Sequence, residues 1–181
     1  MDESIKRQRI LKAFLSILSV LVAAMLVSYI IQQYVLILVV VPTPSMKNTI
    51  NINDRLLGLK TSGLFKYTRI KRGDIVAFKM PDNKEEIYIK RVIGLPGDTI
   101  YIRNSILFVN NKPYKEDYIL EKMEGNYGPY KVPENHYFML GDNRNDSFDS
   151  REWVNPYVEK KDIVGKVIFR VYPLKKIGFI N

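Results

Sequence analysis

A serine and a lysine are the two residues of this chain whose settings are best suited to chemistry. Ser45 lies in Pro42–Met46, where two prolines restrict the backbone and would hold one hydroxyl in a fixed direction. Lys90 lies in a strand-like run, and strand alternation places it on one face with Tyr88 and Val92. Burial among such neighbours disfavours the charged ammonium and lowers the pKa of a lysine. A neutral amine can take the proton of a serine hydroxyl, so the two residues are candidates for nucleophile and general base.

Both residues also have an ordinary structural interpretation. A serine beside proline is a common turn residue, and a strand lysine can extend its ammonium into solvent. A Ser-His-Asp triad would need His136, which is the single histidine of the chain. The place of His136 at the end of a strand-like run favours a partly exposed structural residue.

The composition excludes several other kinds of catalytic and metal-binding site. The chain has no cysteine, which excludes thiolate catalysis, disulfides and cysteine-based zinc sites. A single histidine excludes a metal site built from several histidines of one chain. We therefore expect no metal and no cofactor.

The segment Gly141–Arg151 is dense in Asp, Asn, Arg and Ser, which invites comparison with a calcium-binding loop. Counted from Asp142, the third position is Arg144, the sixth is Ser147 and the twelfth is Trp153, where a calcium loop has an oxygen ligand, Gly and Glu. A cation at a ligand position excludes that interpretation, and the segment is better explained as a hydrogen-bonded scaffold. The ion pairs that we expect in this scaffold join an aspartate to an arginine: Asp142 or Asp149 with Arg144 or Arg151.

The net charge of +9 would suit a nucleic acid, an anionic lipid surface or acidic substrates as partners. The basic residues are spread along the chain, and no zinc-finger, homeodomain or RNA-binding signature occurs. We therefore expect membrane lipid and no nucleic acid as a partner.

An uncharged stretch runs from Ala13 to Met46 and predicts a transmembrane helix over residues 13–34, because about 20 apolar residues cross the hydrocarbon. Four basic residues precede it, and the first charge after it is Lys47. The positive-inside rule then leaves the N-terminus in the cytoplasm and the C-terminal domain outside the cell membrane. A cleaved signal peptide is the alternative, but its apolar region usually has about 7–15 residues and ends in a small-x-small site, which this stretch lacks.

Beyond the apolar stretch, short runs with β character alternate with turn residues and predict a mainly β fold. We expect one antiparallel β-sheet or partly closed barrel after the N-terminal transmembrane helix. The predicted strands are Val35–Val41, Ile75–Lys79, Ile87–Ile93, Thr99–Arg103, Ile106–Asn110, Tyr137–Leu140 and Ile163–Tyr172. Asn104-Ser105 predicts a hairpin turn, and the polar stretch Glu116–Lys131 a surface insertion. The expected parts are residues 1–12 (cytoplasmic), 13–34 (membrane) and 35–181 (extracytoplasmic catalytic domain).

Four segments, in this order, resemble the boxes of type I signal peptidases, of peptidase family S26. They are Pro42–Met46, Arg72–Val76, Lys90–Asp98 and Gly141–Arg151. Together with the preceding anchor, they are similar to the single-span bacterial branch, whose fold is a β-rich body around a small catalytic barrel. The chain departs from that pattern at Pro44, where the family often has glycine, and at Asn48, where it often has proline.

The resemblance implies a role for each matching residue. It implies that Ser45 is the nucleophile and Lys90 the general base, and that the hydroxyl of Thr43 joins the Ser45 N–H in the oxyanion hole. It also implies that Ser147 hydrogen-bonds the lysine, and that Asp149 and Arg151 form an ion pair behind the site. The substrate pockets would be formed near four residues: Met46, Ile50, Tyr88 and Ile89.

The function that we expect is removal of N-terminal signal peptides from exported preproteins by a serine endopeptidase of the membrane. One alternative is another Ser-Lys processing peptidase of the self-cleaving repressor type. Such an enzyme carries a DNA-binding domain or a cleavable linker, where this chain has a membrane span. Another alternative is an anchored β-domain that only binds a partner and lacks a nucleophile or a base.

Overall fold

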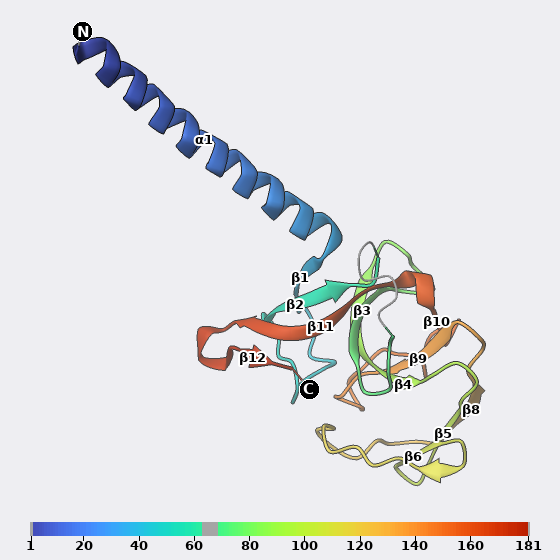
Figure 1. Cartoon of the computed structure of the whole chain (residues 1–181). Helices are drawn as coiled ribbons and strands as arrows, with labels where there is room; N and C mark the ends of the chain where they lie inside the picture. Colours follow the sequence, from blue (N-terminus) through green and yellow to red (C-terminus); the bar gives the residue numbers. More distant parts are fainter. Residues whose placement is uncertain (1, 63–68, 181) are drawn as a thin grey trace.

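The computed structural model describes residues 2–62 and 69–180, which form one long N-terminal helix and a body of antiparallel β-sheets (Figure 1). Helix α1 spans Asp2–Tyr34. Its part from Ile5 to Tyr34 is long and apolar enough to cross a membrane, and its apolar stretch is not buried against the rest of the described chain. The predicted membrane segment 13–34 is helical, but the basic residues before it belong to the same helix, because Lys, Arg and Leu are good helix formers.

The C-terminal end of α1 is tied to the β body by Lys60. Strand β1 (Leu36–Val40) follows the helix almost directly and pairs with β2 (Arg55–Lys60). The ammonium of Lys60 donates to the carbonyls of Gln32 and Gln33, each at 2.8 Å. A cation at the last turn satisfies free carbonyls and interacts favourably with the helix dipole.

The larger sheet carries the strands that surround the candidate site. Its order is β1-β2-β11-β3-β4-β9-β10, all pairs are antiparallel, and β12 pairs with β11. The remaining strands are β3 (Ile75–Lys79), β4 (Ile87–Gly94), β9 (His136–Leu140), β10 (Val158–Glu159), β11 (Ile163–Tyr172) and β12 (Gly178–Phe179). The prediction of an antiparallel β fold is confirmed. Within the described residues the sheet keeps two free ends, β1 and β10, and does not close into a barrel.

A second sheet has the order β7-β6-β5-β8. It consists of β5 (Thr99–Arg103), β6 (Ile106–Val109), β7 (Lys112–Pro113) and β8 (Tyr127–Lys131). The predicted hairpin turn joins β5 to β6, and both of its residues, Asn104 and Ser105, have positive φ (50° and 66°). Positive φ at both positions is typical of the turns whose twist matches that of the flanking strands.

The prediction of a surface insertion over Glu116–Lys131 is wrong. The segment ends in β8, which pairs with β5, and Met123 within it is almost fully buried. The carboxylate of Glu116 is also buried. The error arose because a few anchoring residues are spaced among polar ones, so that the average polarity of the stretch hides them.

The segment that carries Ser45 lies over a small apolar core of its own. Met46 and Ile50, which follow the serine, are buried there against β2, β3 and β11 (the cluster comprises Val41, Met46, Ile50, Leu56, Ile75 and Val167). Burying such a side chain contributes about 1.5–3 kcal/mol. The backbone on both sides of Ser45 is therefore held by packing.

Candidate active site

Ser45 and Lys90 line the same groove, a cavity of about 610 Å³ on the larger sheet. One wall is formed by residues 40–46, at the end of β1, and the other by residues 86–90, at the start of β4. Asp146 and Phe148 add to the lining from the loop that follows β9. The two residues that were singled out from the sequence are thus brought together from distant positions.

Ser45 sits where the chain leaves an extended segment and enters a tight turn. The turn is closed by hydrogen bonds from Lys47 N–H to the Pro44 carbonyl (2.8 Å) and from Ile50 N–H to the Met46 carbonyl (2.8 Å). Ser45 is 6% exposed, and its Oγ lies 3.2 Å from Oγ1 of Thr43. The hydroxyl is therefore held at the groove with a second hydroxyl beside it.

Lys90 is 3% exposed and forms no ion pair with a carboxylate among the described residues, which is rare for a buried amine. Burial is the main cause that lowers the pKa of Lys90 to about 8; Asp149 opposes this shift and Arg151 assists it. Tyr88 and Val92, which were predicted to share its strand face, both pack on one apolar cluster. At mildly alkaline pH a large share of the Lys90 amines is neutral and able to accept a proton.

The loop Gly141–Arg151 is organised around the carboxylate of Asp149. Arg151 donates to both of its oxygens (2.8 and 2.9 Å), and the Gly141 N–H donates to Oδ2 at 3.0 Å. The expected ion pair between Asp149 and Arg151 is therefore present. The hydroxyl of Ser147 also donates to Asp149, at 2.8 Å. Within the described part of the chain, neither Ser147 nor Asp149 forms a hydrogen bond with Lys90. This differs from the expected bond between Ser147 and Lys90: the Ser147 hydroxyl gives its proton to the charged carboxylate of Asp149, which is a strong acceptor.

The same loop also forms hydrogen bonds with the backbone around Ser45. Asn143 donates its N–H to the Ser45 carbonyl at 3.0 Å and its side-chain amide to the Pro44 carbonyl at 3.3 Å. A Cβ on Gly141 would lie 2.5 Å from the Ser45 carbonyl oxygen and 2.2 Å from Oγ of Ser147. Only glycine allows this close approach, so the loop and the serine segment form one tightly fitted unit.

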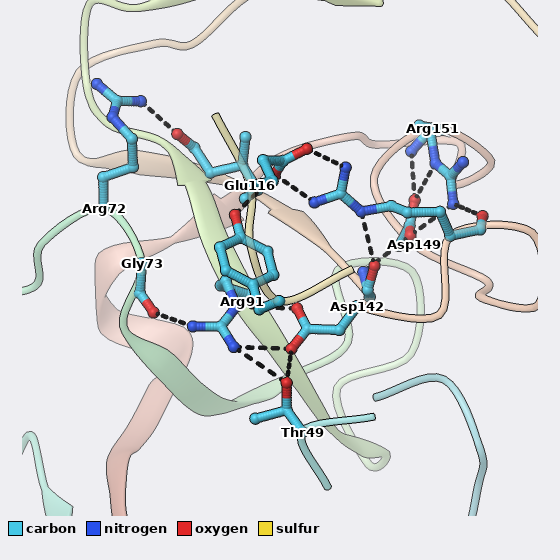
Figure 2. A network of polar contacts seen from close by, with 12 residues as sticks. Thr49, Arg72, Gly73, Arg91, Glu116, Asp142, Asp149 and Arg151 are labelled. Atoms are coloured by element: carbon cyan, nitrogen blue, oxygen red, sulfur yellow. Dashed lines mark hydrogen bonds and ion pairs between the residues drawn. The ribbon is translucent and has the colours of Figure 1, made fainter. Parts of the chain in front are cut away.

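Asp142 pairs with Arg91 and not with Arg144 or Arg151 (Figure 2). Arg91 Nε and Nη2 reach the two oxygens of Asp142 at 2.8 and 2.7 Å, and Nη1 donates to the Gly73 carbonyl at 2.8 Å. The hydroxyl of Thr49 donates to the same carboxylate at 2.5 Å. The expected partner was wrong because two arginines of one loop were closer in sequence, whereas the strand β4 delivers Arg91 from another part of the fold.

Arg144 pairs with Glu116, a residue that the sequence did not single out. The two side chains form two parallel hydrogen bonds, at 2.6 and 2.5 Å, and Arg144 Nε donates to the Gly141 carbonyl at 2.9 Å. The hydroxyl of Tyr118 donates to Glu116 at 2.6 Å. Burial raises the pKa of the Tyr118 phenol, and the Glu116 carboxylate raises it further, so this donor stays protonated.

The signal peptidase profile of peptidase family S26 matches residues 13–172, most of the chain. The chain belongs to the signal peptidase family.

Named relatives agree with this membership. The chain is 37% identical over 145 residues to a signal peptidase I of Leptolyngbya laminosa, covering 76% of this chain and 70% of the relative. It is 39% identical over 170 residues to signal peptidase I P of Bacillus subtilis subsp. natto, covering 88% and 89%. A crystal structure of a signal peptidase I from Enterococcus faecalis is 32% identical, with a TM-score of 0.49, and covers 55% of this chain and 97% of that one. The family profile and the two relatives from Leptolyngbya and Bacillus confirm the resemblance drawn from the ordered segments.

Of the four residues expected near the substrate pockets, three line the groove of this signal peptidase family member. These are Met46, Tyr88 and Ile89. Ile50 is fully buried and does not line it, because its side chain fills the core beneath the serine turn. The sequence did not single out the rest of the lining, which includes the apolar Val40, Ile87 and Phe148 and the acidic Glu86 and Asp146.

No cluster suited to a metal ion occurs among residues 2–62 and 69–180, where no three His, Asp or Glu side chains gather. His136 starts β9 and is partly exposed, as expected for a structural residue at the end of a strand. The groove itself presents the hydroxyl of Ser45 and the amine of Lys90, with the carboxylates of Glu86 and Asp146 also in its lining.

Proposed function

We propose that this chain is a membrane-anchored serine endopeptidase that removes signal peptides from preproteins, with Ser45 as nucleophile and Lys90 as general base. One observation carries the dyad: a lysine buried enough to have a pKa of about 8 lines the same groove as a serine held in a rigid turn. The relatives named signal peptidase I support the choice of substrate.

The reaction begins when the neutral amine of Lys90 takes the proton of the Ser45 hydroxyl. The Ser45 oxygen attacks the carbonyl carbon of the scissile bond, and the carbonyl oxygen becomes an oxyanion. The Lys90 ammonium then returns a proton to the leaving amine, and the peptide bond breaks to leave an acyl-enzyme. Water, deprotonated by the same lysine, releases the signal peptide and restores Ser45.

The oxyanion requires hydrogen-bond donors at the groove. The Thr43 hydroxyl is one candidate, because its Oγ1 lies 3.2 Å from the attacking oxygen. The Ser45 N–H is the other, since it makes no hydrogen bond within the described part of the chain. A donor of this kind stabilises the charge that develops in the transition state and is worth about 10²–10³ in rate.

The shape of the groove suits an extended substrate with small side chains. Its two walls are the end of β1 and the start of β4, so a peptide can lie between them as an added strand. Alternate residues of such a strand face the same way. Positions one and three before the cut then point into the groove, where Met46 and Ile89 form part of the apolar lining, and we expect small side chains at these two positions.

The proposed topology leaves residues 1–12 in the cytoplasm, residues 13–34 in the membrane and residues 35–181 outside; of these, 1, 63–68 and 181 lie outside the described residues. Lys6, Arg7, Arg9 and Lys12 precede the apolar stretch and favour this orientation. Helix α1 then holds the groove close to the lipid surface, where the C-terminal end of a signal peptide emerges. Protease added to intact spheroplasts should digest the β body, and protection of that body would reverse the orientation.

Cleavage of a defined preprotein tests the function. Detergent-solubilised full-length protein is incubated with a preprotein that ends its signal peptide in Ala-x-Ala, and the products are mapped by mass spectrometry. We expect one cut, after the second alanine, and no cut when either alanine is changed to Leu. Binding without cleavage, or efficient cleavage with Leu before the bond, would contradict the proposal.

A further inference from the structure

The segment 116–124 is joined to the loop 141–151 by a buried contact at Glu116, drawn in Figure 2, and by an exposed contact at Glu124. We propose that Glu116, acting through Arg144, is a positioning residue that holds this loop against Ser45 and so sets the geometry of the serine and lysine. The inference rests on the proposed function of that pair. Glu116, Tyr118 and Arg144 together are called the brace below.

The central contact of the brace is a deeply buried ion pair. The side chains of Arg144 and Glu116 are 0% and 5% exposed, and they meet through two parallel hydrogen bonds. An apolar pair of similar volume often stabilises a fold as well as a buried ion pair does, because two charges must be desolvated. The two parallel hydrogen bonds of this pair fix the orientation of the Arg144 side chain relative to that of Glu116.

The brace contacts the surroundings of Ser45 through Arg144 and those of Lys90 through Tyr118. Arg144 Nε donates to the Gly141 carbonyl at 2.9 Å, and the next residues of that turn include Asn143, whose N–H holds the Ser45 carbonyl at 3.0 Å. On the other side, the ring of Tyr118 lies under the guanidinium of Arg91, with 3.9 Å from Cζ to the ring centroid. Arg91 is the neighbour of Lys90 in β4.

More exposed hydrogen bonds also join the segment 116–124 to the loop 141–151 and to the serine turn. The side chain of Asn145 accepts from the Glu124 N–H at 2.9 Å and donates to the Lys122 carbonyl at 3.0 Å. Asn48, three residues after the serine, donates to the Tyr118 carbonyl at 3.0 Å. The segment thus contacts both the loop behind the groove and the turn that begins at Ser45, and a shift of either would break these hydrogen bonds.

The substitution Glu116→Gln removes the negative charge of the brace, leaves the buried guanidinium of Arg144 without its counter-ion and keeps the shape of the side chain. We expect kcat for preprotein cleavage to fall roughly 10–100-fold, because a displacement of about 1 Å is enough for such a loss. The KM should stay within about twofold, since Glu116 itself does not line the groove. The matched control is Asp117→Asn on the next residue, whose side chain is 78% exposed and pairs only with the exposed Lys115; its kcat should equal that of the wild type.

Two further variants keep the test decisive if Glu116→Gln fails to fold. Arg144→Lys keeps a cation for Glu116 but cannot also hold the Gly141 carbonyl, because an ammonium lacks the guanidinium fork. Tyr118→Phe removes one hydroxyl and creates no unpaired buried charge. Both should fold, as judged by a thermal midpoint close to that of the wild type, and both should lose kcat at unchanged KM, Arg144→Lys more than Tyr118→Phe.

The outcomes separate this inference from the proposed function. If the wild type cleaves and a folded Arg144→Lys retains its full kcat, the positioning role of the brace is wrong and the peptidase function stands. If stability falls while the kcat of the remaining folded enzyme is unchanged, the brace is structural only and the inference is again overturned. If the wild type itself does not cleave, the proposed function fails.

Discussion

Lys90 and Arg91 are neighbours in strand β4 and serve opposite faces of the sheet. Lys90 lines the groove with Ser45, whereas Arg91 lies behind it and fixes Asp142 with two hydrogen bonds (Figure 2). One strand therefore supplies both the candidate base and the residue that anchors the loop opposite to it. A shift of β4 by one residue would exchange the two and destroy the site, because alternate side chains of a strand point to opposite faces.

The pH dependence of cleavage follows from the lowered pKa of Lys90. The amine must be neutral to accept a proton, so kcat/KM should rise with pH, pass its half-maximum near pH 8 and level off above it. Initial rates over a pH series with one fluorogenic peptide measure this profile. A profile that is already at its maximum near pH 5–6 would assign the base to a carboxylate.

Lys90→Met should abolish cleavage and yet stabilise the fold at neutral pH. Because the pKa of Lys90 falls from 10.5 to about 8 on folding, the buried ammonium costs stability fully below pH 8, and the cost disappears as the pH rises towards 10.5. Methionine fills a similar volume without charge, so the gain at pH 7 should be on the order of 3 kcal/mol. Urea unfolding at pH 7 and pH 10.5 measures it; an equal gain at both values would show that burial of the charge is not the cause.

Gly141→Ala should inactivate the chain by displacing the serine turn. The added Cβ would lie 2.5 Å from the Ser45 carbonyl oxygen and 2.2 Å from Oγ of Ser147, closer than atoms can approach. The loop must move, at a cost of about 1–3 kcal/mol in unfolding free energy. Gly178→Ala is the matched control, because nothing lies within 4 Å of its added Cβ. Normal cleavage by Gly141→Ala would mean that the loop does not hold the nucleophile.

Thr43→Val tests the proposed oxyanion donor. Valine keeps the shape of threonine and lacks the hydroxyl that lies 3.2 Å from Ser45 Oγ. We expect kcat to fall by about 10²–10³ with little change in KM, since the donor acts on charge that exists only in the transition state. Steady-state kinetics on a preprotein measure both constants. An unchanged kcat would leave the backbone N–H of Ser45 as the donor and Thr43 as a packing residue.

The parts of the fold that could be predicted are those where local chemistry decides the structure. The run 75–79 and the run 99–103 are strands with the predicted bounds, because short apolar or alternating runs between turn residues have few other solutions. The ordered segments around Ser45 and Lys90 also predicted the family to which the chain belongs. Strand β2 was missed, because Gly58 and the preceding polar turn weaken its pattern.

The site could be predicted less well where long-range pairing decides it. Residues Glu116 and Arg144 are far apart in the sequence, and so are Arg91 and Asp142, so that no periodicity links the members of either pair. An arginine of the same loop is a plausible partner for Asp142 until the fold is known, and only the sheet topology brings Arg91 next to it. The sequence therefore showed which residue types were present but not which of them meet.

The cleavage rates of Ser45→Ala, Lys90→Ala and the double variant test the proposed dyad most directly. With one preprotein at pH 8–9, each single variant should lose all measurable cleavage while it keeps the thermal midpoint of a folded protein. The double variant should be no worse than either, because the two residues act as one unit. Lys79→Ala, an exposed lysine of the adjacent strand β3, is the control and should cleave normally. Near-normal cleavage by a folded Lys90→Ala would contradict the account.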